Sequence, residues 1–255
     1  MKEGARKKVI GKIRYIFGHY FRRELSDEEV ESFFNSLEKQ TRVVLATIPN
    51  ATEEDFDRYM NERAEICFSP MSINNEILKI IEKTGIEELE TSSRYKGLGE
   101  ISNAAAFCLA LRKETGEQWM IKGQDNPDIL LVRPNGDGMR NRPFHALGLE
   151  IMEIPVSSGI DFSDHVAIAA FIKEKKFQKR YSGIPHLLIH LNFNQEGLQL
   201  GKISEEIRSL EGNPFHQIWV KANITPDSQV VALTRIYPSF YKIDFDYIQD
   251  RELMY

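Results

Sequence analysis

Residues 186–192, with the sequence His-Leu-Leu-Ile-His-Leu-Asn, form a short run that is apolar at nearly every position. A strand with one face in water alternates apolar and polar residues, whereas a strand buried on both faces is apolar almost throughout. Pro185 stands directly before the run, and proline is tolerated at the start of a strand. The run therefore predicts a central strand of a covered sheet, and hence an α/β fold.

The segment before this strand contains two helical patterns with three strand patterns between them. The first helix is rich in alanine and apolar on most sides, as expected of a helix packed between layers. Turn-rich segments with Gly, Pro and Asn separate the apolar runs that follow it. The helices are expected at residues 101–113 and 166–180, and the strands at residues 118–122, 128–132 and 147–156. From residue 99 to 192 the order is therefore helix-strand-strand-strand-helix-strand.

The N-terminal part of the chain is predicted to be mostly helical. Residues 9–21 place apolar side chains at three- and four-residue steps, the period of an amphipathic helix. Ser26 with Glu29 and Thr52 with Asp55 form capping patterns that open two further helices, and residues 73–84 form another. We therefore expect a helical region at residues 1–92. An α/β core with a C-terminal extension is expected at residues 93–255.

Cysteine content and hydropathy indicate the class of protein and its compartment. Cys67 and Cys108 are the two cysteines, and neither lies in a CxxC or Cys/His cluster, so neither a zinc site nor a disulfide framework is indicated. No stretch of about 18 apolar residues suits a membrane span, and no secretory signal pattern opens the chain. The sequence predicts a cytoplasmic protein that does not bind membranes.

Charge is distributed unevenly along the chain. Residues 1–23 carry eight Lys or Arg against Glu3 alone, which leaves −12 for the remainder of a chain whose net charge is −5. Attraction to nucleic acid would therefore be concentrated in particular segments, either this N-terminal tract or residues 173–180. Both segments can equally be solvated helix faces.

Two carboxylates stand out by their placement in the expected strands. Asp128 opens the second strand directly after Pro127, and Glu150 lies inside the third strand among Leu147, Leu149 and Ile151. A carboxylate in an apolar strand is costly unless something pairs with it, and adjacent strands would bring the two carboxylates about 5 Å apart. A hard cation such as Mg²⁺ or Mn²⁺ would relieve their repulsion and could activate water for phosphodiester hydrolysis.

These residues resemble the PD-(D/E)xK nuclease superfamily. The resemblance rests on Pro127-Asp128, on Glu150-Ile151-Met152 and on the element order over residues 99–192. It implies a restriction-endonuclease-like mixed sheet flanked by helices, with Asp128 and Glu150 as ligands of Mg²⁺ or Mn²⁺. It further implies DNA as the substrate, a homodimer as a common assembly, and an assisting role for Glu100 on the first core helix.

The sequence departs from the family pattern at Met152, where the superfamily has a lysine two residues after the acid. A thioether cannot hydrogen-bond the attacking water as an ammonium does. Either a lysine reaches in from elsewhere, with Lys122 and Lys173 as candidates, or the fold is kept without cutting activity. The sequence thus leaves two functions open: a metal-dependent deoxyribonuclease, or a catalytically inactive nuclease-like binding or assembly protein.

Two other sequence patterns are weaker indications of a functional site. His186 and His190 are four apart in a strand without a third ligand nearby, so they are expected to be sheet residues and not a zinc site. Residues 95–99 contain glycines but lack the ending of a P-loop. A small-molecule enzyme on an unrelated α/β fold is a third reading, which a deep apolar pocket remote from Asp128 would favour.

Overall fold

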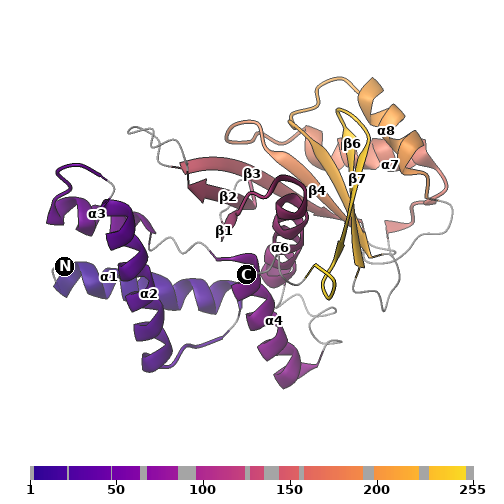
Figure 1. Ribbon diagram of the computed structural model, residues 1–255. Coiled ribbons are helices and arrows are strands. Elements are labelled where there is room, and N and C mark those ends of the chain that lie inside the picture. The colour runs from indigo at the N-terminus through magenta and orange to yellow at the C-terminus, as the bar shows by residue number, and fades with distance from the viewer. Residues whose placement is uncertain are drawn as a thin grey trace.

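The protein is a mixed α/β fold (Figure 1). The structure is a computed structural model that describes residues 3–21, 23–46, 48–63, 68–85, 96–123, 127–134, 144–154, 158–191, 198–223 and 230–250. Its helices are α1 (Glu3–Tyr20), α2 (Asp27–Leu45), α3 (Glu53–Arg63), α4 (Pro70–Thr84), α6 (Lys96–Thr115), α7 (His165–Ile172) and α8 (Leu200–Ser209). Its strands are β1 (Met120–Gly123), β2 (Ile129–Pro134), β3 (Phe144–Glu153), β4 (His186–Leu191), β5 (Ile218–Asn223), β6 (Val230–Tyr237) and β7 (Tyr241–Asp246).

The described strands form one seven-stranded sheet whose spatial order is the same as the chain order. β3, β4 and β5 run parallel to one another, and the outer pairs β1–β2, β2–β3, β5–β6 and β6–β7 are antiparallel. β4 is the fourth of the seven strands, which confirms the central strand predicted from its apolar run. The expected order helix-strand-strand-strand-helix-strand is present as α6-β1-β2-β3-α7-β4.

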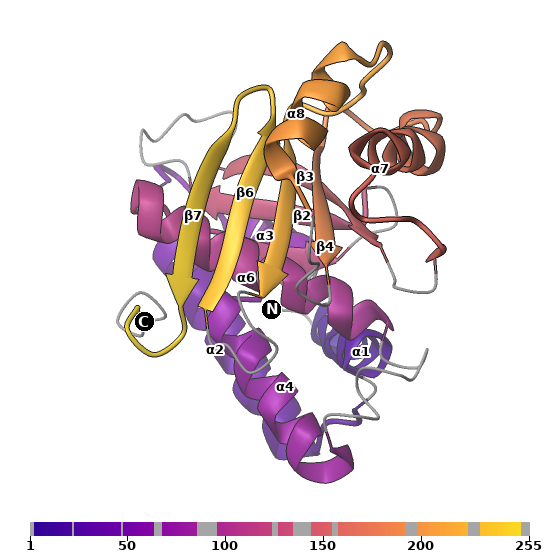
Figure 2. The ribbon, with the colours of Figure 1, turned by 90° about the vertical axis from the view of Figure 1, so that its right-hand side faces the viewer.

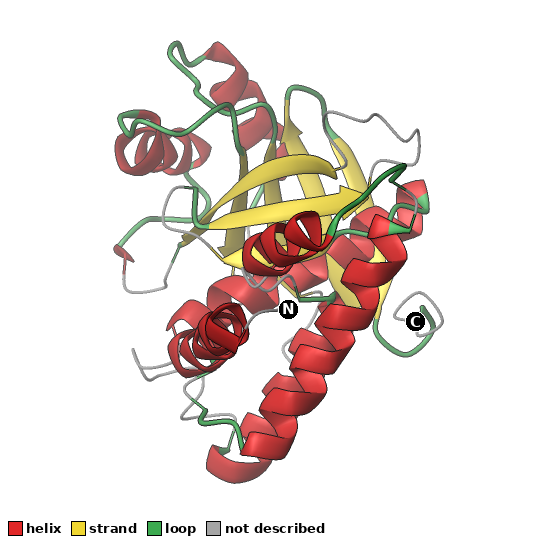
Figure 3. Ribbon diagram, turned by 90° about the vertical axis from the view of Figure 1, so that its left-hand side faces the viewer, coloured by secondary structure: helices red, strands yellow, loops and turns green. Residues whose placement is uncertain are grey.

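The two faces of the sheet carry different side chains, because successive residues of a strand point to opposite faces. In β3, Leu149 and Ile151 belong to a cluster with α6, whereas Met152 belongs to a second cluster with α7 and α8. Figures 2 and 3 show helices on both sides of the sheet, with α7 and α8 on one side. Both faces are therefore buried, as the apolar β4 requires.

The N-terminal helices share a hydrophobic core with α6 and the sheet. Phe17 of α1 and Phe21, just after α1, pack against Phe68, whose backbone exchanges two 2.7 Å hydrogen bonds with Ile121 of β1. Both predicted capping patterns are confirmed: Glu29 N donates to Ser26 Oγ and Asp55 N to Thr52 Oγ1, and each carboxylate accepts the backbone N–H of its partner.

Part of the basic N-terminal tract is paired within the fold. Arg6 forms an ion pair with Glu31 of α2, Arg14 forms one with Asp27, and Lys7 forms one with Glu3. These contacts favour the solvated helix face over a free nucleic-acid-binding arm. Among the described residues no helix is long and apolar enough to cross a membrane.

Two elements differ from the sequence expectation. The helix expected at residues 166–180 is α-helical only to Ile172 and continues as a π-helical turn, Lys173–Phe177. β7 was not predicted, although Tyr241, Ile243 and Phe245 alternate in the manner of a strand; Phe245 is fully buried, and Tyr241 packs against the same core. Cys108 is buried and forms no disulfide among the described residues, and Cys67 lies outside them.

A buried ammonium lies between the sheet and α6. Lys221 of β5 is 8% exposed and its Nζ donates to Asn103 Oδ1 at 2.7 Å. Burial lowers the pKa of Lys221 to about 8, because the charged form loses its hydration. The charged form is thus less favourable in the folded protein than in the unfolded chain, where the ordinary value is 10.5.

We expect Lys221→Met to raise the stability of the protein at neutral pH by roughly 1 kcal/mol, since it removes the charge at the cost of one hydrogen bond. In the parent protein the free energy of unfolding should rise between pH 8 and 10.5, because the unfolded chain binds more protons in that window. Urea unfolding across this window measures both effects. A parent curve that is as flat as that of the variant would contradict the assignment.

Candidate functional site

Asp128 directly precedes β2 and lies opposite Glu150 of β3. Ile129 pairs with Leu149 in the antiparallel register, so the preceding Asp128 faces Glu150 across the two strands. Side chains at such positions are about 5 Å apart. Glu150 is 2% exposed, and Asp128 is half-buried. The fold thus brings together the two carboxylates that the sequence singles out.

The backbone of β3 holds Asp128 in place. Ile151 N donates to Asp128 Oδ2 at 2.8 Å. β3 pairs without a register shift to both neighbouring strands, so Glu150 and Met152 share one face. Glu153 points to the other face and is exposed, so Glu150 is the carboxylate of β3 that faces Asp128.

Two lysines of the segment after α7 contact Glu150. Lys176 Nζ donates to Glu150 Oε1 at 2.5 Å and to the backbone oxygen of Ile151 at 2.7 Å. Lys179 Nζ donates to the same Oε1 at 3.2 Å. The side chain of Lys176 is 10% exposed and that of Lys179 is 54% exposed. One ammonium is therefore buried against the carboxylate, and the other is open to solvent.

The π-helical turn delivers Lys176 to this position. Asp164 caps α7 by accepting Ala167 N, and Ile168 and Ile172 are buried on the face toward the sheet. Lys176 follows Ile172 by four residues, and both Lys176 and Phe177 are buried at the π-helical turn. A lysine on the apolar stripe of a helix was the sequence signal that could have identified Lys176.

Neighbouring side chains fix the segment that carries Lys176. Phe177 packs against Phe215 with ring centroids 6.1 Å apart, and Tyr181 packs against the same ring at 5.1 Å. The hydroxyl of Tyr181 donates to the backbone oxygen of Lys176 at 3.0 Å. The ammonium is therefore held by packing and hydrogen bonding on both sides of residue 176.

Met152, two residues after Glu150, stands where the resemblance to the superfamily predicts a lysine. It lies on the same face as Glu150, is 5% exposed, and belongs to the hydrophobic cluster that contains Ile172 and Phe177. A thioether thus packs beneath the helical segment, and an ammonium from that segment reaches the carboxylate.

The charges of the site influence one another. Burial raises the pKa of Asp128 above its ordinary value, and Glu150 adds to this, although the Ile151 amide and both lysines oppose it. Burial lowers the pKa of Lys179, but the Glu150 carboxylate outweighs this and the net shift is upward. Burial, followed by the charges of Glu150 and Asp128, raises the pKa of Tyr181, so its hydroxyl stays protonated. An added cation would favour ionised Asp128.

The other predicted site residues lie elsewhere. Lys122 is on β1, on the same face as Glu150 but two strands away, and Lys173 begins the π-helical turn. Among the described residues the ion pairs of Glu150 are made by Lys176 and Lys179, and roles for Lys122 and Lys173 stay predictions. Glu100 is half-buried near the start of α6, which covers the opposite face of the sheet, and the charges that shift the pKa of Asp128 do not include Glu100.

The two histidines of β4, His186 and His190, pair with Leu149 and Glu153 of β3, so they lie on the face of the sheet opposite Glu150. Burial, together with the charges of His216 and Arg235, lowers the pKa of His186 to about 4. His186 packs beside His216, with ring centroids 5.2 Å apart. Among the residues that the structure describes, no group of three or more His, Cys, Asp or Glu side chains is placed to hold a metal.

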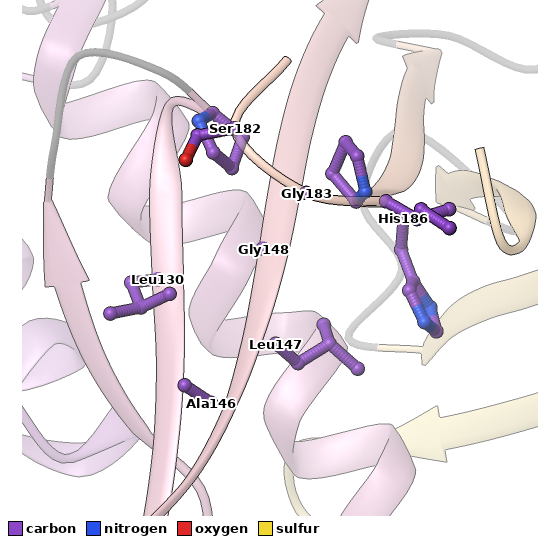
Figure 4. Close-up of a pocket in the computed structure, with 10 residues that line it drawn as sticks. Leu130, Ala146, Leu147, Gly148, Ser182, Gly183 and His186 are labelled. Atoms are coloured by element: carbon purple, nitrogen blue, oxygen red, sulfur yellow. The ribbon is translucent and has the colours of Figure 1, made fainter. Parts of the chain in front are cut away.

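A cavity of about 380 Å³ adjoins the carboxylates (Figure 4). Its walls come from the start of β2, the middle of β3 and the loop before β4. They are Pro127, Leu130, Ala146, Leu147, Gly148 and residues 182–186. The cavity is close to Asp128 and not remote from it, so it lacks the placement that would favour an unrelated small-molecule enzyme.

No family model, curated protein or solved structure matches this chain. The case for its function therefore rests on the geometry of this site.

Proposed function

We propose that the protein is a metal-dependent deoxyribonuclease with a PD-(D/E)xK-type site, in which Lys176 supplies the ammonium that is missing at Met152. The contact of Lys176 Nζ with Glu150 Oε1 and the Ile151 oxygen carries this proposal. The order α6-β1-β2-β3-α7-β4 supports a restriction-endonuclease-like core. The proposal accounts for a buried lysine beside two carboxylates on neighbouring strands of the sheet.

The donor groups fit Mg²⁺ or Mn²⁺. Magnesium is commonly held by one or two carboxylates and keeps several waters, so Asp128 and Glu150 suffice without a third acidic residue. Burial raises the pKa of Asp128, so a cation beside this carboxylate would favour its ionised form. Because Lys176 and Lys179 balance the formal charge of the two carboxylates, we expect metal affinity to be weaker than for an isolated carboxylate pair.

Each residue has a distinct role in the proposed reaction. A bound cation supplies Lewis acidity toward the phosphodiester and a lower pKa for the attacking water. Lys176 donates hydrogen bonds to the water and stabilises negative charge as it develops. Lys179, which is open to solvent, binds a phosphate oxygen of the substrate. Tyr181 keeps the backbone of Lys176 in place.

A second candidate function is a catalytically inactive nuclease-like binding or assembly protein. The pairing of Glu150 with two ammonium groups favours this candidate, because the buried carboxylate is satisfied without a metal. In that case the site is a structural ion pair, and metal binding is not needed. A cytoplasmic location and a homodimer stay predictions under either function.

Calorimetric titration with Mn²⁺ separates the two candidates. We expect the parent protein to bind Mn²⁺ and to cleave DNA, and Asp128→Asn to lose at least tenfold in affinity together with cleavage. Affinity should fall as the pH drops toward the raised pKa of Asp128, since protonation removes a ligand. Glu153→Gln is the matched control, because Glu153 is exposed on the other face of the same strand. Absence of Mn²⁺ binding by the parent protein would establish the structural ion pair instead.

A further inference from the structure

The cavity beside the carboxylates lies where a neighbouring part of a nucleic-acid substrate would be. Pro127 directly precedes Asp128, and Gly148 lies two residues from Glu150 on the same strand face. Two residues of a strand span about 7 Å. The third wall begins at Ser182, next to Tyr181. A phosphate held at the carboxylates would therefore place its own nucleoside at the mouth of the cavity.

Gly148 allows the rings of Pro127 and Pro185 to pack close to β3, which narrows this part of the cavity. A Cβ atom at residue 148 would lie 2.7 Å from Pro127 Cγ and 3.3 Å from Pro185 Cβ. The two prolines therefore pack directly over the strand, at a distance that only glycine permits. Figure 4 shows Leu130 and Ala146 along the neighbouring strands, with Ser182 and Gly183 on the loop that passes close to Gly148.

The lining suits a flat heterocycle with polar edges. Proline and leucine side chains supply apolar surface, while the Ser182 hydroxyl and the loop backbone supply hydrogen-bonding groups. The volume of about 380 Å³ lies within the range of pockets that hold small ligands. Apolar walls with a few polar groups are the usual lining of such sites, and a nucleobase matches them.

Two features at the rim of the cavity also suit a nucleic-acid strand. Ile184 is 73% exposed, although it is a large apolar residue. Exposed apolar side chains that insert between base steps are a common means of unstacking nucleic acid. Lys179 and Arg180 are exposed on the segment that leads into this loop, so positive charge lies close to where the phosphates would run.

We infer that the cavity takes an unpaired nucleobase of the strand that is cut, and that the substrate is single-stranded DNA. This inference rests on the proposed function, because the phosphate position defines which base reaches the cavity. A base within a duplex is stacked and paired, so it must be extruded at a cost in free energy before it can enter the cavity. The single strand avoids that cost and is therefore preferred.

The test compares oligonucleotides that share the same phosphates. Fluorescence anisotropy in EDTA, where cleavage cannot occur, measures affinity for a single strand, for its duplex and for a strand of abasic deoxyribose units. We expect the parent protein to bind the intact single strand at least tenfold tighter than the other two. Equal affinity for the intact and abasic strands would overturn the inference.

Variants that fill the cavity with a large side chain test whether the nucleobase binds there. Ala146→Trp and Ser182→Trp start from exposed residues, so the fold should tolerate them. Each should reduce the preference for the intact strand to below twofold. Val166→Trp, at a position that is 53% exposed on α7 and outside the lining, is the matched control and should keep the preference. A preference that survives both cavity variants would refute the assignment.

Cleavage, Mn²⁺ binding and base-dependent binding together distinguish failure of this inference from failure of the proposed function. Mn²⁺-dependent cleavage with equal rates on duplex and single strand would support the nuclease function and refute the nucleobase site. A different result would be base-dependent binding that both cavity variants abolish, in a protein that neither binds Mn²⁺ nor cleaves DNA. This result would support the nucleobase site and refute the nuclease function.

Discussion

Replacement of Lys176 by methionine is expected to lower the rate of metal-dependent DNA cleavage by about 10²- to 10³-fold. The variant removes the buried ammonium that contacts Glu150 and the Ile151 oxygen, but it leaves both carboxylates in place. Mn²⁺ affinity should stay the same or increase, because one positive charge next to the ligands is lost. Single-turnover cleavage rates together with calorimetric titration measure the two quantities separately.

Lys173→Met is the control for this variant. Lys173 belongs to the same π-helical turn but forms no ion pair with Glu150, so its replacement should change the cleavage rate by less than twofold. A rate that falls equally in both variants would mean that the turn acts through general positive charge. An unchanged rate in Lys176→Met would exclude Lys176 from the chemistry.

Stability must be measured beside activity, because Lys176→Met leaves Glu150 with Lys179 as its remaining ion-pair partner among the described residues. Removal of one member of a buried ion pair costs about 3–5 kcal/mol when the other member is left uncompensated. Lys176→Arg keeps a positive charge and tests folding independently. We expect added Mn²⁺ to raise the Tm of Lys176→Met more than that of the parent protein, since the cation restores a partner to Glu150.

The central strand and the carboxylate pair could be predicted from the sequence because they follow from local patterns. The apolar run of β4 has no other stable place than the middle of a covered sheet, and the strand periods of β2 and β3 put Asp128 and Glu150 on one face. The antiparallel register then aligns the two residues. In these places local pattern and tertiary structure agree.

The apolar stripe of the helix points to Lys176, but the sequence alone does not show that this ammonium reaches Glu150, because that contact is tertiary. Residues 173–180 contain five Lys or Arg, and the position of the π-helical turn determines which of them points inward. A continuous α-helix through residue 180 would have placed these side chains differently along the segment. The strand β7 was missed for a related reason, since its pairing with β6 and not its composition defines it.

Transfer of the lysine from the helix back to the strand should restore much of the activity that Lys176→Met loses. Met152 and Lys176 approach Glu150 from the strand and from the helix, and the double replacement Met152→Lys with Lys176→Met exchanges the two side chains. A lysine at residue 152 lies two residues after the acid on the same strand face, the arrangement of the superfamily pattern. We expect the double variant to cleave at least tenfold faster than Lys176→Met.

The single variant Met152→Lys completes the double-mutant cycle. It places a second ammonium in a buried region, so its Tm should fall while its cleavage rate should not exceed that of the parent protein. A non-additive gain that appears only when Lys176 is absent would show that the two positions supply the same group. A double variant that folds but cleaves no faster than Lys176→Met would instead mean that Lys176 holds Glu150 in place and takes no part in the reaction.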